Sequence, residues 1–597
     1  MRRIFPVAAA VAVLALAACG GRSGPEAGDF DPAIDTNLGD VPRTDVLYPD
    51  TVPPEAGQED VAGDVDGQPE AVAGDPGADG GGEDAFEVPG DAPGDTLGDT
   101  AGDTAGDTGT PPTLECGGDP LPATEACTVQ KGGSAILDRG DFLVPDGILR
   151  NGALLIDPTG LIACVGCDCA SQAGAAGATV LACGGALVTP GLINGHDHIT
   201  YTGNTPKGHG TDRYQHRHEW RKGLNGHAKI SVPSTSGAEA WGELRNILGG
   251  ATSMFGSGQA PGLLRNLDRD LMGGIPASEK ATYDTFPLDD SGGTMNTSGC
   301  NYGDIKTSAS IDDVPCYVPH VAEGINEAAR NEFRCLSSTA NGGQDLVRSN
   351  TSFIHGVGLT ANEVAEMARD GTALIWSPRS NIDLYGNTAP VTLYRRLGVV
   401  IGLGTDWTAS GSINMLREMQ CARQFGQANL GGALTDRQIV DMATSANAKA
   451  FRMDDVVGSL RVGLVADLAV FDARTNRDEA AVVLATPRDV VAVLRGGMPL
   501  YGDAAVVEGL PQGSGCETMD VCGRGKRVCA ERETGKKLAA LKPAGAYDLF
   551  FCGTPAGEPS CVPARQGEYD GVPKAGDADG DGIPDAQDKC PDRFDPA

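Results

Sequence analysis

Short apolar runs alternate with helical segments through the centre of the chain. Between about residues 236 and 450, stretches with helical spacing, such as 238–248 and 435–451, separate strand-like runs. This alternation is typical of an α/β fold. The preceding part has short apolar runs divided by Gly, Pro and Asp, at 135–137, 153–156 and 161–164. Those runs predict a region of β-strands.

A polar element stands at or just after each of four further apolar runs. The elements are His196-Asp197-His198, His320 with Glu323, His355, and Asp406, and the runs are 186–188, 316–318, 352–354 and 399–403. A two-residue step along a strand returns side chains to the same side, so His196 and His198 can face one ion. Imidazole and carboxylate ligands suit a catalytic zinc or a similar divalent metal. The pattern predicts a metal site at the strand ends.

The same residues resemble the amidohydrolase superfamily, in its deaminase and chlorohydrolase-like branch. The resemblance covers about residues 133 to 505. The segments that carry it are 188–198, the glycine-rich 249–253, Ser377-Pro378-Arg379-Ser380-Asn381, Gly402-Leu403-Gly404-Thr405-Asp406, 448–451, 457–460 and 463–471. Together these segments form a specific pattern, which none of them would provide alone.

The resemblance implies a distorted TIM (β/α)8 barrel with its site at the carboxyl ends of the strands, plus a small composite β-sandwich from segments on both sides of the barrel. The implied metal ligands are His196, His198, His320 and Asp406, and the implied catalytic residues are Glu323, His355 and Asp406. Glu323 would carry protons, and His355 would polarise the substrate or orient water. One zinc ion is expected, with iron or manganese as alternatives.

The expected reaction is hydrolysis of a non-peptide carbon–nitrogen bond in a small molecule, by deamination or by opening of a cyclic amide or amidine. Metal-activated water would attack an sp2 carbon that bears a nitrogen leaving group. A carbon–halogen or ester hydrolase would use the same chemistry, and a non-catalytic binding or scaffold protein is an alternative of another class. Candidate substrate contacts are Tyr201, Trp376 and Ser377. For Trp376, packing inside the barrel is an equal alternative.

Two further features have competing interpretations. Glu323 could cap a helix expected near residues 324–334 instead of carrying protons. A second His-x-His pair lies in the basic stretch 203–229, which does not follow an apolar strand; its histidines are His209, His216, His218 and His227. We expect an active-site loop that contacts substrate and does not ligate the main metal. Its candidate anion-binding residues are Arg213, Tyr214 and Arg221.

The first residues predict export and lipidation. Met1-Arg2-Arg3 and the following apolar stretch form a secretion signal that is too short for a comfortable transmembrane span. Leu16-Ala17-Ala18-Cys19 looks like a bacterial lipobox, so we expect lipidation of Cys19, with an ordinary signal peptide as the alternative. Gly20 permits sorting to the outer membrane, where the protein would face the periplasm or the cell surface.

Residues 20–112 consist of Gly, Asp, Pro, Ala and Glu with almost no aromatic residues. Such a segment cannot offset its ordering entropy, so we expect a disordered tether, about 50–60 Å long on average. It contributes much of the net charge of −35, which argues against a nucleic-acid partner. The sequence does not decide whether the protein is a monomer or a homo-oligomer.

Seventeen cysteines in an exported chain indicate disulfides. The final part of the chain has little apolar content and holds Cys516, Cys522, Cys529, Cys552, Cys561 and Cys590. We expect a small module stabilised by disulfides there, but the sequence does not show which cysteines pair. Cys164, Cys167 and Cys169 have metal-like spacing, but no second pair or nearby His completes a site, so a disulfide is expected.

The tail ends in the spacing of a calcium loop, with Gly582 at the sharp turn. The expected calcium ligands are Asp577, Asp579, Asp581, Ile583, Asp585 and Asp588. With Cys590 the segment also resembles one thrombospondin type 3 repeat; an acidic solvated tail is the alternative. The expected domains are the signal peptide 1–19, linker 20–112, β-sandwich parts 113–188 and 456–510, barrel 189–455, and Cys-rich tail 511–597.

Overall fold

The computed structural model describes residues 113–256, 260, 262–269, 275, 279–565 and 574–591. The predicted signal peptide, the lipidated Cys19 and the linker 20–112 lie outside the described residues. Within the described ranges, no helix is both long enough and apolar enough to cross a membrane.

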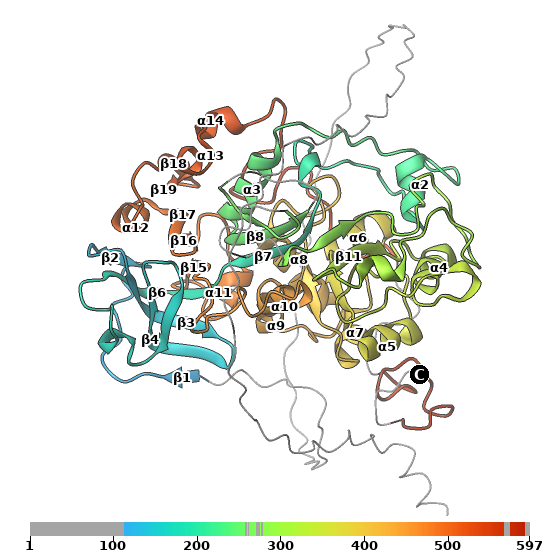
Figure 1. Cartoon of the computed structure of the whole chain (residues 1–597), viewed down its shortest axis with the longest axis horizontal. Coiled ribbons are helices and arrows are strands. Elements are labelled where there is room, and N and C mark those ends of the chain that lie inside the picture. Colours follow the sequence, from blue (N-terminus) through green and yellow to red (C-terminus); the bar gives the residue numbers. More distant parts are fainter. Residues whose placement is uncertain are drawn as a thin grey trace, which may run out of the picture. The chain divides into compact units, whose positions relative to one another are not determined.

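One eleven-stranded sheet combines the two flanks of the chain, and it lies beside the central strands in Figure 1. The first flank contributes β1 (Thr113–Glu115), β2 (Thr128–Gln130), β3 (Ile136–Val144), β4 (Gly147–Ile156), β5 (Ile162–Gly166) and β6 (Thr179–Pro190). The second contributes β15 (Leu468–Asp472), β16 (Val490–Arg495), β17 (Met498–Asp503), β18 (Glu517–Val521) and β19 (Arg524–Val528). The order is β1-β4-β3-β6-β15-β16-β17-β19-β18, with β2 on β6 and β5 on β4.

Antiparallel pairing of β6 with β15 joins the two flanks, with Val188 opposite Val470. Both side chains are fully buried in a core that also contains Phe142 and Leu154. The sheet continues past the expected boundary at residue 510, because β19 pairs with β17. The first part of the expected Cys-rich tail is therefore a part of this sheet.

Eight parallel strands form the centre of the molecule in chain order. They are β7 (Leu192–Asp197), β8 (Ala251–Gly256), β9 (Arg265–Asn266), β10 (Thr282–Asp284), β11 (Tyr317–Val321), β12 (Ser352–His355), β13 (Ala373–Trp376) and β14 (Ile401–Leu403). They make two sheets, β7-β8-β9 and β10-β11-β12-β13-β14. Hydrogen bonds link the sheet edges, from Ala281 N to Leu267 O and from Asp406 N to His196 O, each 2.9 Å long. The α/β arrangement is TIM-barrel-like in strand order and direction, although its pairing is divided between two sheets.

Most of the central strands are buried along their whole length because helices and loops cover both faces. Every residue of β11, β12, β13 and β14 is buried. The apolar run 186–188 was expected to form the strand that leads to His196, and this is wrong in detail. The run belongs to β6 of the large sheet. The shorter strand β7 carries His196, with His198 immediately after it.

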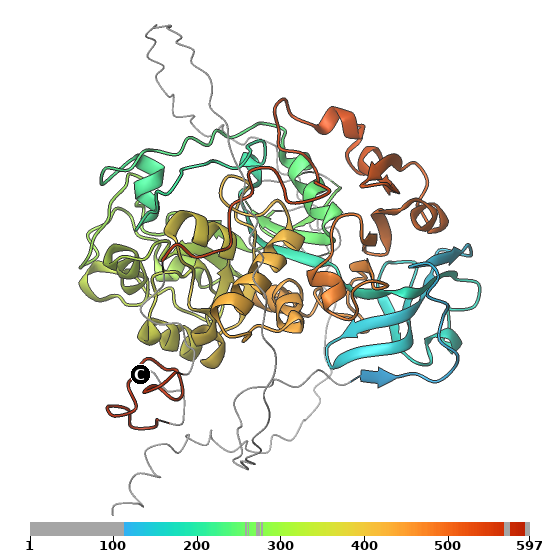
Figure 2. The same ribbon diagram turned by 180° about the vertical axis from the view of Figure 1, so that it is seen from behind.

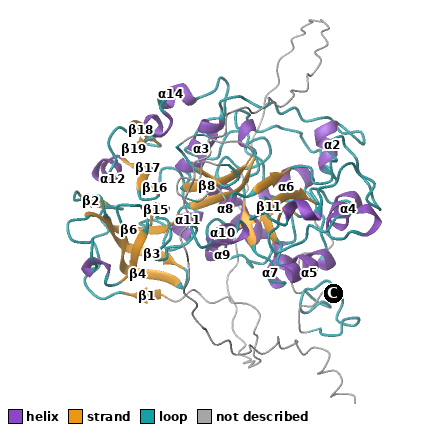
Figure 3. Ribbon diagram, viewed as in Figure 1, coloured by secondary structure: helices purple, strands orange, loops and turns teal. Residues whose placement is uncertain are grey.

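Helices surround the central strands in both opposite views (Figures 1 and 2), and Figure 3 separates them by colour. The described helices are α2 (Arg217–Lys222), α3 (Glu239–Leu248), α4 (Glu327–Leu336), α5 (Ala361–Asp370), α6 (Pro378–Tyr385), α7 (Val391–Arg396), α8 (Met415–Asn429), α9 (Asp436–Met442), α10 (Ser445–Ala450), α11 (Ala480–Val483), α12 (Ala504–Gly509), α13 (Ala530–Thr534) and α14 (Leu538–Leu541). The last three lie beside β17, β18 and β19 of the large sheet (Figure 1). The helix expected over 435–451 is two helices, α9 and α10, because Thr444 leaves the helical region at φ −137° and ψ −96°.

Seven disulfides join described residues: Cys116–Cys167, Cys127–Cys183, Cys164–Cys169, Cys300–Cys335, Cys421–Cys561, Cys516–Cys529 and Cys522–Cys552. The disulfide expected among Cys164, Cys167 and Cys169 is confirmed. The stapled tail is not self-contained, because Cys561 pairs with Cys421 of α8. Cys316 is buried and free, and its Sγ lies 3.3 Å from Ala450 O.

Candidate active site

Three histidines and one aspartate converge where the central strands end. The Nε2 atoms of His196 and His198 lie 3.2 and 3.4 Å from Oδ1 of Asp406. The Nε2 atoms of His198 and His320 are 3.3 Å apart. Ligand atoms of the three histidines all lie within 4.8 Å of one another, and so do those of His196, His355 and Asp406. The structure therefore brings together every residue expected to hold the metal.

The spacing and chemistry of these atoms fit a divalent metal. Ligands about 2.0–2.2 Å from a tetrahedral zinc ion lie about 3.3–3.6 Å from one another. Neither ring nitrogen of the fully buried His196 has a hydrogen-bond partner among the described residues. A buried nitrogen without a partner is unfavourable unless a ligand occupies it. Metal coordination by this set would satisfy those nitrogens.

Neighbouring groups prepare the histidines to act as ligands. Nδ1 of His320 lies 3.1 Å from the backbone oxygen of Asp284, which can only accept, so Nδ1 carries the proton and Nε2 presents its lone pair. The Tyr283 hydroxyl lies 3.0 Å from Nδ1 of His198. Burial lowers the pKa of His198 to about 4 and that of His320 well below its usual value. Both rings are neutral at pH 7, as metal binding requires.

Asp406 is the anionic member of the group. Burial alone would raise its pKa, but the close approach of His196 and the charges of His196, His198 and His355 lower the pKa overall. The Ser380 hydroxyl donates to Oδ2 of Asp406 at 2.6 Å, which leaves Oδ1 facing the histidines. The carboxylate is therefore ionised and held in one orientation.

Three residues around the site have left-handed backbone conformations. The φ angles are +53° at Ala322, +76° at His355 and +63° at Asp406. Such angles cost a non-glycine residue about 1–3 kcal/mol and occur mostly where function requires them. His355 and Asp406 are expected site residues. Their unfavourable backbone conformations direct both side chains into the site.

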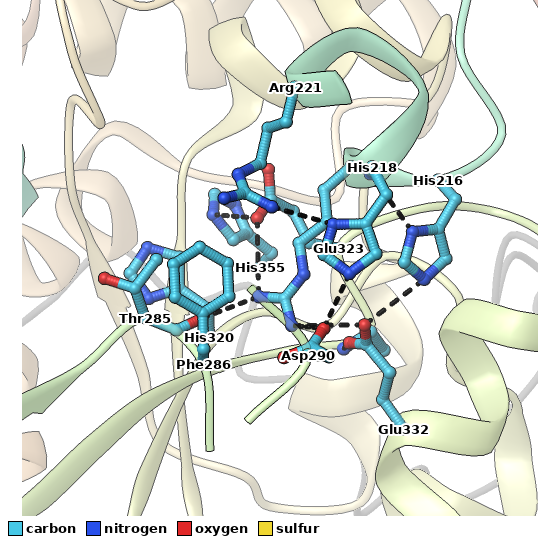
Figure 4. Close-up of polar contacts among 12 residues, drawn as sticks. His216, His218, Arg221, Thr285, Phe286, Asp290, His320, Glu323, Glu332 and His355 are labelled. Atoms are coloured by element: carbon cyan, nitrogen blue, oxygen red, sulfur yellow. Dashed lines mark hydrogen bonds and ion pairs between the residues drawn. The ribbon is translucent and has the colours of Figure 1, made fainter. Parts of the chain in front are cut away.

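Glu323 lies in the site and does not cap a helix. Asn326 is the N-cap of α4, where its Oδ1 accepts from the amide of Ala329 at 3.0 Å. Oε1 of Glu323 accepts from the Tyr385 hydroxyl at 2.6 Å, and Oε2 lies 3.7 Å from Nε2 of His355. The side chain of Glu323 reaches toward His355 in Figure 4. This position suits a proton carrier next to the metal ligands.

His355 is oriented from behind by Asn381. Its Nδ1 lies 3.0 Å from Asn381 Oδ1, and the Asn381 amide nitrogen donates to the hydroxyl of Thr388 at 3.2 Å. The carbonyl oxygen of Asn381 therefore accepts from Nδ1–H, and Nε2 faces the site. Asn381 is the last residue of the Ser-Pro-Arg-Ser-Asn segment. Through this contact the segment orients the His355 ring.

The three candidate substrate contacts occupy different environments. The Tyr201 ring lies edge-on to that of His198, with centroids 6.3 Å apart, so it borders the site. Ser377 is fully buried before α6, and its Oγ has no hydrogen-bond partner among the described residues. Trp376 follows the packing alternative that the sequence left open: it is fully buried, donates to Thr388 at 2.6 Å and packs against Phe425. Its position is that of a core residue.

The histidines of the 203–229 stretch have carboxylate partners outside the metal cluster. His216 lies 3.2 Å from Glu332, and His218 lies 2.8 Å from Asp290. His209 lies 3.0 Å from Asp383, and His227 lies 2.9 Å from Asp212. None of the four belongs to a candidate metal group among the described residues. They fix the loop that carries α2.

Sequence reasoning missed the residues that orient the site from behind. Tyr283 and Asp284 belong to β10, a three-residue strand whose pattern gives little signal. Tyr385 lies at the end of α6 and is recognisable only from its contact with Glu323. Trp407 follows Asp406, and its ring lies 5.6 Å from that of His198.

The acidic tail forms a separate cluster. Carboxylate oxygens of Asp577, Asp579 and Asp581 lie within 4.8 Å of one another. The other expected calcium ligands form local backbone contacts: Asp585 Oδ1 accepts from Ala578 N at 2.7 Å, Asp588 Oδ1 accepts from Cys590 N at 2.9 Å, and Ile583 N donates to Asp581 Oδ1 at 2.7 Å. Calcium binding stays a prediction.

Comparison with known proteins finds a family model that matches part of the chain. Residues 319–500, which include His320, Glu323, His355 and Asp406, match the sequence model of the amidohydrolase family. The chain is 27% identical over 371 residues to the 5-methylthioadenosine/S-adenosylhomocysteine deaminase of Halobacterium salinarum, covering 56% of the chain and 83% of that relative. It is 34% identical over 151 residues to the enzyme of that name from Teredinibacter turnerae, covering 24% of the chain and 34% of that relative.

Solved structures similar to the chain include zinc-bound enzymes. An adenosine deaminase from Xanthomonas campestris with bound zinc matches at 18% identity and a TM-score of 0.43, over 65% of this chain and 93% of that chain. Atrazine chlorohydrolase from Arthrobacter aurescens, in complex with zinc, matches at 19% identity and a TM-score of 0.44, over 61% of this chain and 95% of that chain.

Proposed function

We propose that the protein hydrolyses a non-peptide carbon–nitrogen bond in a small molecule, by deamination or by opening of a cyclic amide or amidine. The observation that carries the proposal is the convergence of His196, His198, His320 and Asp406 beside the buried Glu323. The relatives named as deaminases support the choice of a carbon–nitrogen bond. The three histidines and Asp406 would hold one divalent metal, for which zinc suits the mixed imidazole and carboxylate donors.

A metal at this position would lower the pKa of a water molecule to about 7 and polarise the substrate. Asp406, ionised and 3.2 Å from His196, can accept the proton that the water loses. Glu323 can collect a proton and deliver it to the departing nitrogen, while the hydrogen bond from Tyr385 holds its carboxylate in place. Water adds to the carbon, the carbon–nitrogen bond breaks, and the nitrogen leaves as ammonia or as an amine with the transferred proton.

We also propose that the enzyme is anchored to the bacterial cell envelope through a lipid on Cys19, with residues 20–112 as the tether. The lipobox-like Leu16-Ala17-Ala18-Cys19 supports this proposal. Metabolic labelling with a fatty acid tests it: label incorporated into the full chain and absent from Cys19→Ser supports lipidation, whereas equal labelling contradicts it.

A third proposal is that the acidic tail binds calcium. Asp577, Asp579 and Asp581 are each more than nine-tenths buried, which is unfavourable for three adjacent carboxylates unless a cation neutralises them. Titration of the full chain with calcium should show one site that Asp579→Asn weakens. A titration in which Asp579→Asn binds as tightly as the natural chain would contradict the proposal.

The catalytic proposal is tested with metal-replete protein and a panel of aminated heterocycles, cyclic amides and amidines, by measuring ammonia release or ring opening. We expect turnover of at least one compound and a loss of at least 100-fold in Glu323→Gln. Glu327→Gln, four residues further along and on the surface of α4, is the matched control. No turnover of any compound, or equal turnover by Glu323→Gln, would contradict the proposed function.

A further inference from the structure

Two arginines of α2 lie near Glu323, and they differ in how their charges are matched. Nη1 of Arg217 is 4.0 Å from Oε2 of Glu323, and the side chain of Arg221 points toward Glu323 in Figure 4. Arg217 is fully buried and is surrounded by acids, with Nη2 2.7 Å from Asp290 and 3.2 Å from Glu332. It also donates to the backbone oxygen of Thr285 at 2.8 Å. Its charge is neutralised within the protein, so Arg217 is a structural residue.

Arg221, one turn later, has no such partner. It is half-buried, and among the described residues no carboxylate lies within ion-pair distance of its guanidinium group. Its one hydrogen bond to a described residue runs from Nη1 to Nδ1 of His218, at 2.8 Å. The rest of the guanidinium lies over the Phe286 ring, 4.2 Å from its centroid. An arginine has five N–H donors, so most of them lack an acceptor.

The contact with His218 positions Arg221 without neutralising it. Nε2 of His218 donates to Asp290 at 2.8 Å, so its Nδ1 is the unprotonated nitrogen that accepts from Arg221. Burial lowers the pKa of His218, so the ring is a neutral acceptor. The order Asp290, His218, Arg221 therefore fixes the direction of the guanidinium group and leaves its positive charge available. This role also explains the second His-x-His pair of the sequence.

The side chain of Arg221 points from α2 toward Glu323 and His355 of the site (Figure 4). A planar guanidinium group recognises a carboxylate through two parallel hydrogen bonds. A doubly charged phosphate suits this position less, because Glu323 and Asp290 lie close by and would repel the second charge.

We propose that Arg221 is a specificity-determining residue that binds a carboxylate group of the substrate, with Phe286 and His218 holding it in position. The proposal rests on the proposed function and narrows its substrate class to amidines, cyclic amides or aminated heterocycles with a carboxylate near the reacting carbon. Arg221 contacts the substrate and takes no part in the proton transfers.

The binding test uses the metal-replete full chain with benzoate, its neutral analogue benzamide, and inorganic phosphate as probes in calorimetric titrations. Arg221→Gln should lower the preference for benzoate over benzamide by about 10- to 100-fold, as expected for loss of a charge-assisted bidentate pair. Arg221→Lys should restore part of the preference, because it keeps the charge without the planar fork. Lys222→Gln, an exposed neighbour with the same change in charge, is the matched control and should bind as the natural chain does.

An unchanged preference in a folded Arg221→Gln protein, judged by its thermal midpoint, would overturn the proposal. Tighter binding of phosphate than of benzoate would overturn the carboxylate assignment. A second measurement separates this proposal from the proposed function, using substrate pairs that differ only in a carboxylate. Turnover of both members with equal KM, unaffected by Arg221→Gln, contradicts the role of Arg221 and leaves the hydrolase intact. Binding of benzoate through Arg221 with no turnover of any compound contradicts the hydrolase alone.

Discussion

Asp138 offers a prediction that needs no knowledge of the substrate. It lies in β3 with none of its surface exposed, among the apolar residues of the large sheet. Burial raises its pKa from 3.8 to about 8, and only the neighbouring backbone amide of Arg139 acts in the opposite direction. The folded protein therefore keeps this carboxyl protonated at pH values where the unfolded chain has released the proton.

The sign of the effect on stability follows from proton binding. Between about pH 4 and pH 8 the folded state holds one proton more at Asp138 than the unfolded state, so stability falls as pH rises. The slope is about 1.4 kcal/mol per pH unit, which amounts to about 5–6 kcal/mol across this window. Other buried acids titrate in the same range; Glu243 and Glu418 each have a pKa raised by burial to about 7. The difference between variants isolates the contribution of Asp138.

Asp138→Asn should therefore remove a large part of the loss of stability between pH 4 and pH 8. The assay is urea unfolding of the disulfide-intact protein at a series of pH values, with the free energy of unfolding compared between chains. Asp146→Asn, in an exposed turn at the end of the same strand, is the control and should follow the natural chain. If the natural protein and Asp138→Asn differ by a constant free energy at every pH, the assignment of this raised pKa is wrong.

Three further predictions concern the site and its support. Tyr385→Phe should lower kcat about 10- to 100-fold in steady-state kinetics, because Glu323 loses a short hydrogen bond; an unchanged kcat would refute this role. Glu323→Gln should keep its metal content in elemental analysis, since Glu323 is not a proposed ligand; loss of metal would refute that assignment. Replacing Cys421 and Cys561 together by Ala should destabilise the protein by about 2–4 kcal/mol in thermal melts, whereas an unchanged midpoint would show that their disulfide adds no stability.

The metal-site residues at the strand ends were predictable because each is recognisable from residues next to it in the sequence. His196 and His198 are two residues apart, and His320, His355 and Asp406 each follow an apolar run that forms a strand or leads into one. The strand order makes these ends meet. The α/β fold was predictable from alternating element types. The contribution of both flanks to one β domain was an implication of the family resemblance.

The contacts that orient the site were not predictable, because they depend on side-chain packing between distant elements. The bond between Tyr385 and Glu323 spans 62 residues, and the contact between Tyr283 and His198 spans 85 residues. No spacing rule relates such pairs. For Trp376 the sequence left a pocket wall and barrel packing as equal alternatives, and only the structure decides between them, because its indole group packs against Phe425 in the core.

Disulfide pairing was also not predictable from the sequence, because it depends on contacts between distant elements. Cys561 lies among tail cysteines in the sequence, yet its partner is Cys421 of α8, 140 residues away. The tail module is therefore tied to the helices around the central strands. Only the fold brings these two thiols together, and six cysteines alone allow many pairings.

The metal content of the purified full chain tests the central claim most directly. Elemental analysis of the natural protein should give one transition metal per chain, with zinc favoured, and calcium is counted separately because of the acidic tail. His196→Ala should lose most of that transition metal, whereas His216→Ala, a buried histidine bound to Glu332 outside the metal group, should retain it. Equal transition-metal content in the natural protein and His196→Ala, or none in either, would contradict the proposed metal site. It would also contradict the proposed hydrolysis, which depends on that metal.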